Sequence, residues 1–488
     1  MSLLEEIQQN ILDIQDNIDI FALRNQRGMR PAEVVGSDRS SGIEREAPVF
    51  ELDATHDPAR RSFVEAANLA GADFPLQNLP FGIFRLEGGT VGRGGVAIGD
   101  KILDLAAAQA ASLLSGTAET AAAAASRPKL NVLMALGNEP ARALRARLAD
   151  LLDTAGPERR KVEAMADRLL VPMAAATLEL PTAICDFTDF LTSSFHSERL
   201  APSGKVTPNF KSMPIAYHSR ASSVRVSGGT VTRPHGQWLD ADGAPQFGPS
   251  LALDYELEVG AYIGMGNALG SPIALDAARS HIFGFCLLND WSVRDVQRWE
   301  SLPLGPFLAK SLSTSVSPWV ITEAAMRPFR TAAFRRPEGD PAPLPYLASE
   351  REGDSGGYDL SLSSSLLTPR LRQAGQAPER VTSTNFKHMY WTFAQMVTHH
   401  ASNGCNLMPG DLIGSGTTSG PTDESRACLA ELTARGSKPL SLANGEARAW
   451  LEDGDEVIFR AKAERDGFVS IGFGECRGMI GPAVRWPE

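Results

Sequence analysis

Three hydrophobic patterns follow one another along the chain. Residues 4–25 repeat apolar side chains at spacings of three and four, which puts one set on one helical face: Leu4, Ile7, Ile11, Ile14, Ile18 and Phe21. This period is typical of a heptad coiled coil and equally of an amphipathic helix docked on its own domain. We therefore expect residues 1–27 to form a helix for assembly or targeting. Residues 28–70 are polar and mixed, which predicts a linker or tail.

From residue 71 onward, short β-prone runs alternate with turn residues. Runs at 81–84, 95–98 and 101–105 are separated by glycine and aspartate, and they precede alanine- and leucine-rich stretches at 106–125, 129–152 and 158–170. This order predicts a small N-terminal β-module with following helices over residues 71–180.

The rest of the chain, residues 181–488, is predicted to form one large domain that is mixed and dominated by β structure. Its expected strands lie at 223–226, 253–263, 319–322, 358–362, 411–414, 427–433 and 456–461. Its expected helices lie at 276–281, 292–300 and 385–400.

Residues 254–314 concentrate candidate metal ligands. In DYELEVGAYIG the acidic residues Glu256 and Glu258 alternate with apolar ones, so strand periodicity places both glutamates on one face. The apolar run IFGFCLLND then ends at Asp290. Like charges on one face repel unless a cation lies between them, and calcium and magnesium prefer oxygen ligands. A lone carboxylate on a strand is more often solvated. The prediction of a metal site therefore depends on the acidic residues as a group.

Other polar residues near this stretch could serve the chemistry. His196 follows Asp189 by seven residues, and a hydrolytic metal site commonly needs a base nearby, although a lone histidine is more often structural. Lys310 is flanked by apolar residues, which favours a half-buried lysine paired with an acid. Arg294 and Gln297 are one helical turn apart and could donate to one oxyanion.

Composition narrows the classes of partner. The net charge of -11 and the acidic isoelectric point argue against nucleic acid, and no apolar run approaches the roughly 20 residues of a membrane span. The five cysteines are scattered without a C-x-x-C pair, which argues against a disulfide framework or structural zinc. We expect a cytoplasmic protein that acts on a small molecule.

Several long blocks resemble one known family. They include DFPLQNLPFGIF, CDFTDFLTSSFH, YHSRASSVRVSG, LDYELEVGAYIG, HIFGFCLLNDWSVRDVQRWE and GPFLAKSLST. These blocks resemble the fumarylacetoacetases, which hydrolyse a carbon–carbon bond of a β-diketo acid in tyrosine and phenylalanine catabolism. The resemblance spans most of the chain after its first seventy or so residues. It implies a small SH3-like β-barrel before the large catalytic domain, and a homodimer or larger homo-oligomer.

The resemblance also implies metal ligands. Four carboxylates would hold a divalent metal, Ca²⁺ in this family: Asp189, Glu256, Glu258 and Asp290. Lys310 and Thr314, together with Asp290, match a second family site described for Mg²⁺.

Catalytic and substrate-binding roles follow from the same likeness. His196, oriented by Glu431, would activate water, and three residues would stabilise the oxyanion: Arg294, Gln297 and Lys310. Tyr217 and Thr417 match substrate-binding positions, and Gln297 would contact the substrate as well.

Three substrate positions depart from the family pattern. Leu191 and Ser301 stand where the family usually has tyrosine, and Lys205 is the nearest candidate for a family arginine in a shortened segment. The complete set of metal ligands and base nevertheless makes hydrolysis of fumarylacetoacetate to fumarate and acetoacetate the primary prediction. One alternative is a hydrolase or decarboxylase of the same superfamily acting on a different diketone or 2-oxo acid. The other is a non-catalytic metal-binding scaffold.

Overall fold

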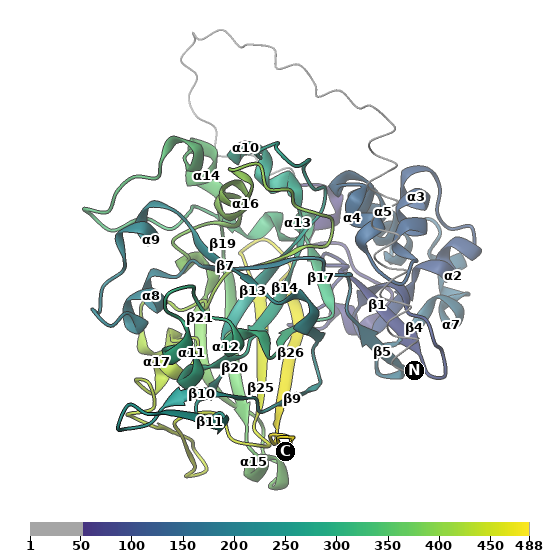
Figure 1. Cartoon of the computed structure of the whole chain (residues 1–488). Helices are drawn as coiled ribbons and strands as arrows, with labels where there is room; N and C mark the ends of the chain where they lie inside the picture. The colour runs from purple at the N-terminus through teal and green to yellow at the C-terminus, as the bar shows by residue number, and fades with distance from the viewer. Residues whose placement is uncertain (1–51, 488) are drawn as a thin grey trace. The chain divides into compact units, whose positions relative to one another are not determined.

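The largest sheet of the protein joins strands from both halves of the sequence (Figure 1). The computed structural model describes residues 52–487, so the predicted helix over residues 1–27 lies outside the described residues. The main path of the sheet runs in this order: β4 (Leu170–Pro172), β3 (Lys101–Asp104), β2 (Arg93–Ile98), β1 (Phe81–Leu86), β17 (Trp319–Thr322), β14 (Ile282–Asp290), β13 (Leu257–Ile263), β22 (Leu412–Gly414), β6 (Phe187–Leu191) and β7 (Ile215–Ser219). Three further strands extend it: β5 (Ala176–Glu179) pairs with β1, and β16 (Thr314–Val316) pairs with β14 and with β8 (Val224–Val226).

The predicted N-terminal β-module shares this sheet with the rest of the chain. Strand β1 pairs antiparallel with β17 through Phe81 opposite Val320. Six helices accompany the module: α2 (Leu105–Ala110), α3 (Gly116–Ala125), α4 (Asn131–Ala135), α5 (Asn138–Leu152), α6 (Arg159–Glu163) and α7 (Ala166–Leu169). The continuous helix predicted over residues 106–125 is broken in two, because Ser112 and Gly116 take positive φ angles that a right-handed helix does not allow.

A second, five-stranded sheet completes the β-rich fold. Its order is β21 (Glu379–Asn385), β20 (Leu360–Leu367), β25 (Glu456–Ala463), β26 (Ile471–Gly481) and β9 (Thr230–Thr232). Four two-stranded pairs add to it: β10 (His235–Leu239) with β11 (Pro245–Pro249), β12 (Leu253–Asp254) with β15 (Ser292–Val293), β18 (Arg330–Thr331) with β19 (Gly357–Tyr358), and β23 (Leu440–Ser441) with β24 (Ala447–Arg448). The mixed, β-rich fold class predicted from the sequence is confirmed, and its SH3-like barrel stays a prediction.

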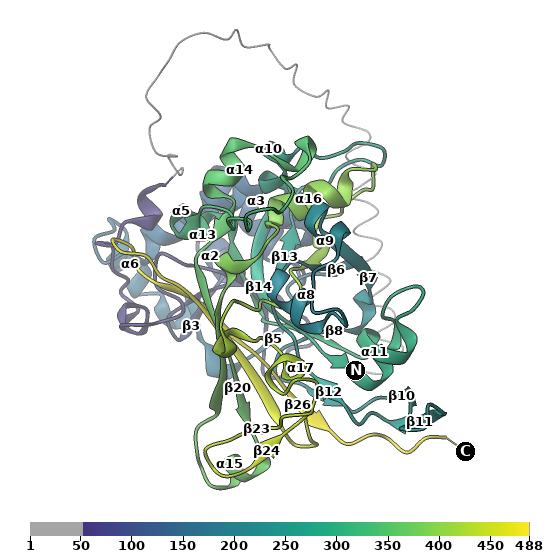
Figure 2. The same cartoon turned by 90° about the vertical axis from the view of Figure 1, so that its left-hand side faces the viewer.

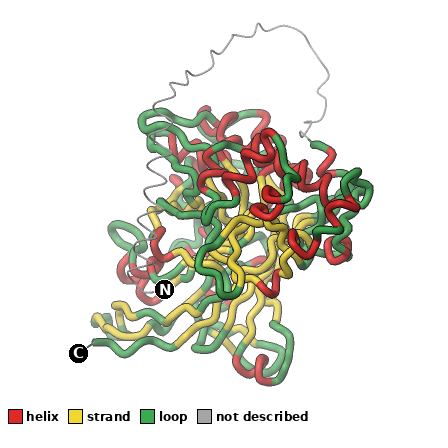
Figure 3. The backbone as a smooth tube through the Cα atoms, turned by 90° about the vertical axis from the view of Figure 1, so that its right-hand side faces the viewer, coloured by secondary structure: helices red, strands yellow, loops and turns green. Residues whose placement is uncertain are grey.

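The helices of the larger part are short, and several gather at one end of the strands (Figure 2). The α-helices of this part as a whole are α8 (Ser194–Leu200), α9 (Pro208–Ser212), α10 (Leu275–Ala278), α11 (Arg294–Glu300), α12 (Leu308–Ser311), α13 (Glu323–Met326), α14 (Glu350–Ser355), α15 (Pro369–Gln373), α16 (Phe393–Ala401) and α17 (Leu429–Leu432). Figure 3 shows the same tendency, with most helices above the long strands and a few beside and below them. Over residues 52–487, none of the helices has the length and apolar character that a membrane crossing requires.

The end of the predicted linker is packed rather than extended. Residues 52–70 contain two short 3-10 helices, η1 (Ala54–His56) and η2 (Glu65–Asn68). His56 is buried and its Nε2 lies 2.8 Å from the Ala324 carbonyl oxygen, while Val64 and Ala67 join the hydrophobic core. The linker prediction therefore differs from the structure over this part, because sparse apolar side chains find partners from distant segments.

Other predicted elements differ from the observed ones as well: the strand expected at 253–263 is divided into β12 and β13, and the helix expected at 292–300 begins at Arg294, after β15. The strand expected at 427–433 is wrong, since this segment forms helix α17. Its backbone N–H groups at Leu429 and Ala430 donate to the carboxylate of Asp254 at 2.7 and 3.0 Å, so a distant residue caps the helix. The helix expected at 385–400 begins late: Asn385 ends strand β21, and α16 starts at Phe393.

Candidate active site

Neighbouring strands bring the four predicted carboxylates together. Asp189 lies on β6, Glu258 on β13 and Asp290 at the end of β14, while Glu256 directly precedes β13. Strand β13 pairs with β14 and with β22, and β22 pairs with β6. One oxygen from each of the four carboxylates lies within 4.8 Å of the others, and all four side chains are buried. We call these four residues the acidic quartet.

Burial makes ionisation of the carboxylates in the acidic quartet energetically unfavourable. Burial, together with the charges of the neighbouring carboxylates, raises the pKa of Asp189 and of Glu258 well above the ordinary values. Burial also acts to raise the pKa of Glu256, but the charges of Lys310 and Arg294 outweigh it and hold that pKa low. When all four carboxylates are ionised, the negative charge of the quartet exceeds the positive charge that Lys310 and Arg294 supply.

The quartet has the properties of a site for a hard divalent cation. Among the described residues, Asp189 Oδ1 and Glu258 Oε1 are buried without a hydrogen-bond partner. Gly414 lies against the same two carboxylates, and a Cβ there would come within 2.6 Å of Asp189 Oδ1 and 3.1 Å of Glu258 Oε2. A set of carboxylate oxygens with unused lone pairs beside a residue without a side chain fits calcium or magnesium.

Two buried cations contact the quartet. Lys310 Nζ donates to Glu256 Oε2 at 2.6 Å and to Asp290 Oδ2 at 2.7 Å, which leaves one of its three N–H groups for another acceptor. Arg294 binds Asp254 through Nε at 2.8 Å and Glu256 through Nη2 at 2.7 Å.

Arg294 also orients its neighbour on helix α11. Its Nη1 donates to Gln297 Oε1 at 2.9 Å, which assigns the carbonyl side of that amide to the arginine.

Two hydroxyl groups contact the quartet as well. Tyr217, on β7 opposite Asp189, donates to Asp189 Oδ2 at 2.6 Å and contacts Asp290 Oδ2 at 2.8 Å. Thr314, on β16 opposite Asp290, donates to Asp290 Oδ1 at 3.2 Å. The structure therefore places Tyr217, predicted to bind substrate, against the carboxylates themselves.

The predicted base and its orienting carboxylate form a separate buried pair. His196 on α8 and Glu431 on α17 meet with Nδ1 2.6 Å from Oε1. Burial acts to raise the pKa of Glu431, but the His196 charge and hydrogen bonds from His196, Ser419 and Arg199 lower it to about 2. With Nδ1–H donating to this carboxylate, Nε2 is the nitrogen that can accept a proton.

Residues that the sequence reasoning missed surround this pair. Arg199 Nη1 donates to Glu431 Oε2 at 2.9 Å, and the Ser419 hydroxyl donates to Oε1. The Cys428 thiol lies 3.6 Å from the same Oε1, and burial, followed by the charges of Asp254 and Glu431, raises its pKa well above the ordinary value. Only Arg199 carried a usable signal, since it lies one helical turn after His196.

Of the predicted substrate-binding residues, Thr417 is closest to the base, with Oγ1 3.4 Å from His196 Nε2. Ser301 directly follows helix α11, and its hydroxyl donates to the Gln297 carbonyl at 2.5 Å. Leu191 packs against a small apolar cluster around Phe210. Lys205 is exposed, and no contact among the described residues joins its side chain to the quartet.

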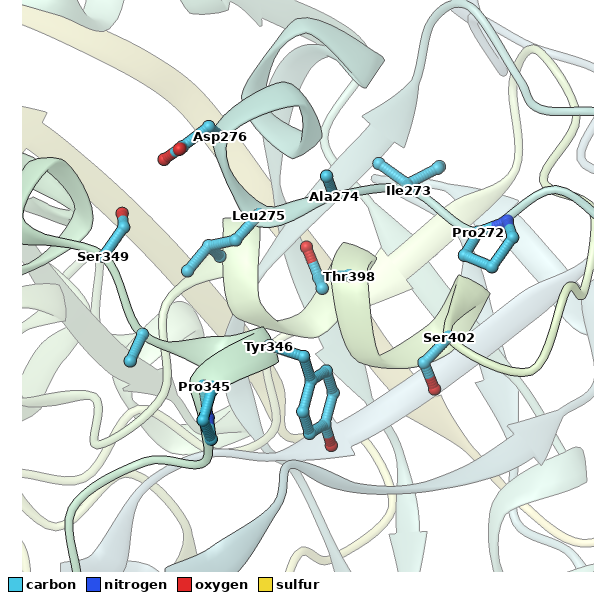
Figure 4. A pocket seen from close by; sticks show the side chains of 11 residues that line it. Pro272, Ile273, Ala274, Leu275, Asp276, Pro345, Tyr346, Ser349, Thr398 and Ser402 are labelled. Carbon is cyan, nitrogen blue, oxygen red and sulfur yellow. The ribbon is translucent and has the colours of Figure 1, made fainter. Parts of the chain in front are cut away.

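A cavity of about 490 Å³ lies elsewhere, between the start of α10, the 3-10 helix η7 (Pro345–Leu347) and α16. Figure 4 shows Leu275, Tyr346 and Thr398 among its lining side chains. None of the predicted site residues lines it. The candidate chemistry is therefore separate from this cavity.

Two family models match the chain in succession. The model described as Fumarylacetoacetase N-terminal matches residues 77–181, and the model described as Fumarylacetoacetate (FAA) hydrolase C-terminal matches residues 187–480. Together they cover the acidic quartet and the His196–Glu431 pair.

Whole relatives align along nearly their full length. The chain is 45% identical to a fumarylacetoacetase of Oryza sativa subsp. japonica over 87% of this chain and 98% of the relative. It is 42% identical to a fumarylacetoacetase of Homo sapiens over 87% of this chain and 99% of the relative. The solved fumarylacetoacetate hydrolase of Exiguobacterium antarcticum aligns with a TM-score of 0.45 at 16% identity over 83% of this chain and 99% of that one.

Proposed function

This chain belongs to the fumarylacetoacetase family, and we propose that it hydrolyses fumarylacetoacetate to fumarate and acetoacetate. The observation that carries the proposal is the presence of a buried histidine–carboxylate pair and a buried acidic quartet in one chain that matches both family models. The reaction class is hydrolysis of a carbon–carbon bond in a ketonic substrate.

The chain's own residues support a definite course for this hydrolysis. His196 Nε2 takes a proton from water, and the resulting hydroxide oxygen bonds to the carbonyl carbon. The carbonyl oxygen takes the negative charge; as the carbonyl re-forms, the carbon–carbon bond breaks and its electron pair stays with the acetoacetate carbon. That carbon takes up the proton that His196 had removed from water. Two donors stabilise the negative charge on the carbonyl oxygen. One is the N–H of Lys310 that the carboxylates leave unused, and the other is the amide of Gln297, which Arg294 holds in place.

The acidic quartet supports a metal-dependent reaction. Asp189, Glu256, Glu258 and Asp290 would hold Ca²⁺, and Lys310 and Thr314 mark the position proposed for Mg²⁺ beside Asp290. A divalent cation supplies Lewis-acid polarisation of a carbonyl oxygen when bound. Assembly as a homodimer and a cytoplasmic location belong to the same proposal.

A turnover panel tests the function. Purified protein is offered fumarylacetoacetate, simple acylpyruvates and oxaloacetate in separate assays with Ca²⁺ or Mg²⁺. Hydrolysis of fumarylacetoacetate well above the other substrates is the expected result. Preference for oxaloacetate or an acylpyruvate would instead support the alternative substrate class, to which Leu191 and Ser301 point, and absence of turnover on all three would support the scaffold alternative.

A further inference from the structure

The carboxylate of Glu431 is bound through both of its oxygens by groups from one helix. His196 contacts Oε1 and Arg199 contacts Oε2, and the two residues are three positions apart on α8. The Glu431 side chain has no exposed surface, whereas the Arg199 side chain is 21% exposed. The arginine therefore reaches from the protein surface to a buried charge.

Other groups fix the position of Arg199 independently of Glu431. Its Nη2 donates to the Gly420 carbonyl at 2.9 Å and to the Thr422 carbonyl at 3.3 Å. Its guanidinium carbon also lies 6.0 Å from the centroid of the Phe195 ring. These contacts hold the guanidinium at the carboxylate whatever the charge of the neighbouring imidazole.

The charge balance around Glu431 then decides the state of the base. A buried carboxylate requires a positive partner. With Arg199 in that role, His196 can remain neutral, donate Nδ1–H to Glu431 and keep the Nε2 lone pair for a proton from water. Without Arg199, the group best placed to supply the positive charge is His196 itself, and a protonated imidazole is no longer a base.

The other charged or titratable groups near His196 and Glu431 do not take over this role. Arg426 is paired with Asp423, and its Nη1 donates to the main-chain carbonyl of Glu431 at 2.8 Å and not to the carboxylate. Cys428, which precedes α17, stays a neutral thiol because burial raises its pKa. Glu256 is close enough to His196 for their charges to interact, but it is paired with Lys310 and Arg294. Thr417, from the segment after β22, is uncharged.

We propose that Arg199 is a positioning residue that keeps His196 unprotonated by supplying the countercharge of Glu431. This inference rests on the proposed hydrolase function and adds to it a residue that sets the pH range of the reaction. The effect acts through Glu431 and requires no contact between Arg199 and substrate.

The test compares kcat/KM as a function of pH in four proteins: the wild type, Arg199→Gln, Arg199→Lys and Arg435→Gln. Arg435 is the matched control, because its Nη2 donates to the Leu200 carbonyl at the same end of α8 at 2.7 Å and Glu431 is not among its contacts. Arg199→Gln should move the acid limb of the profile upward by about one pH unit or more, a roughly tenfold loss on that limb. Its rate should recover to within a few-fold of wild type on the alkaline plateau. The acid limb of Arg199→Lys should lie between those of the wild type and Arg199→Gln, and the acid limb of Arg435→Gln should coincide with that of the wild type.

A uniform loss of rate at every pH in Arg199→Gln, or an unshifted acid limb, would overturn the inference while leaving the hydrolase function intact. A wild type without turnover would overturn the function itself. In that case ¹⁵N-histidine spectra still test Arg199, with His196→Gln used to assign the ring signals. The His196 ring should stay protonated to higher pH in Arg199→Gln, and identical titrations in the two proteins would contradict the role.

Discussion

The acidic quartet and the Glu431 carboxylate are both buried, yet their charges are balanced in opposite ways. The quartet gathers four carboxylates, and Asp189 Oδ1 and Glu258 Oε1 have no partner among the described residues. Glu431 is a single carboxylate whose two oxygens accept from His196, Ser419 and Arg199. The difference teaches that one region presents unpartnered oxygens to an ion from solution, whereas the other is completed by the chain itself.

The largest expected effect comes from removing the base. His196→Ala should lower kcat by about 10² to 10⁴-fold, the range of general acid–base contributions, because no other described side chain occupies its place beside Glu431. Metal affinity, followed by calorimetric titration with Ca²⁺, should stay at the wild-type value, since His196 is not part of the quartet. Unchanged turnover, or a lost metal site, would contradict the separation of the two regions.

Removing a buried cation from the quartet should lower stability in addition to turnover. Lys310→Met leaves Glu256 and Asp290 without their shared partner, and breaking a buried ion pair costs about 3–5 kcal/mol of unfolding free energy. Urea titration measures it. The control is Lys387→Met, because Lys387 pairs with Asp359 at an exposed position, where about 0–1 kcal/mol is expected. Equal effects in both variants would count against a buried charge balance at the quartet.

Metal removal should distinguish the two regions directly. A cation at a hundred times its dissociation constant stabilises the folded state by about 3 kcal/mol, so chelation should lower both the melting temperature and the turnover of the wild type. Glu258→Gln should largely abolish this response to Ca²⁺, and Glu431→Gln should retain it. Indifference of the wild type to a chelator would argue against a cation in the quartet.

The smallest expected effect is on the free energy of unfolding at acidic pH. The folded pKa of Glu431, about 2, is below its ordinary value of 4.5, so its contribution to stability is present above pH 4.5 and is lost as the pH falls toward 2. Between pH 4.5 and 3.5 the wild type should lose about 1 kcal/mol more unfolding free energy than Glu431→Gln. Urea titrations at the two pH values measure this difference, and parallel losses would show that the carboxylate is not selectively stabilised.

Local pattern was enough to predict those parts of the site that lie on regular strands. The strand Trp319–Thr322 matches its predicted bounds, and Glu258 and Asp290 lie on adjacent paired strands. Glu256, however, directly precedes β13 rather than lying within it, so its approach to the quartet depends on the short irregular segment between β12 and β13.

Helix α17 could not be predicted, because its cause lies far away in the sequence. Residues 429–432 are good helix formers, but so short a helix is unstable alone, and the carboxylate of Asp254 caps it from 175 positions away. The role of Arg199 could not be predicted for a related reason. Its spacing from His196 can be read from the sequence, but its contact with Glu431 cannot, because Glu431 lies far away in the sequence.

Asp254 has a consequence for how the protein acquires activity. Its carboxylate accepts from the N–H groups of Leu429 and Ala430 and from Arg294 Nε, so it ties the helix that carries Glu431 to the arginine beside Glu256. Contacts of such sequence separation form late, because the entropy of closing a long loop must be overcome first. A growing chain therefore completes the His196–Glu431 pair only after α17 has been synthesised, and we expect activity to return during refolding together with the last long-range contacts.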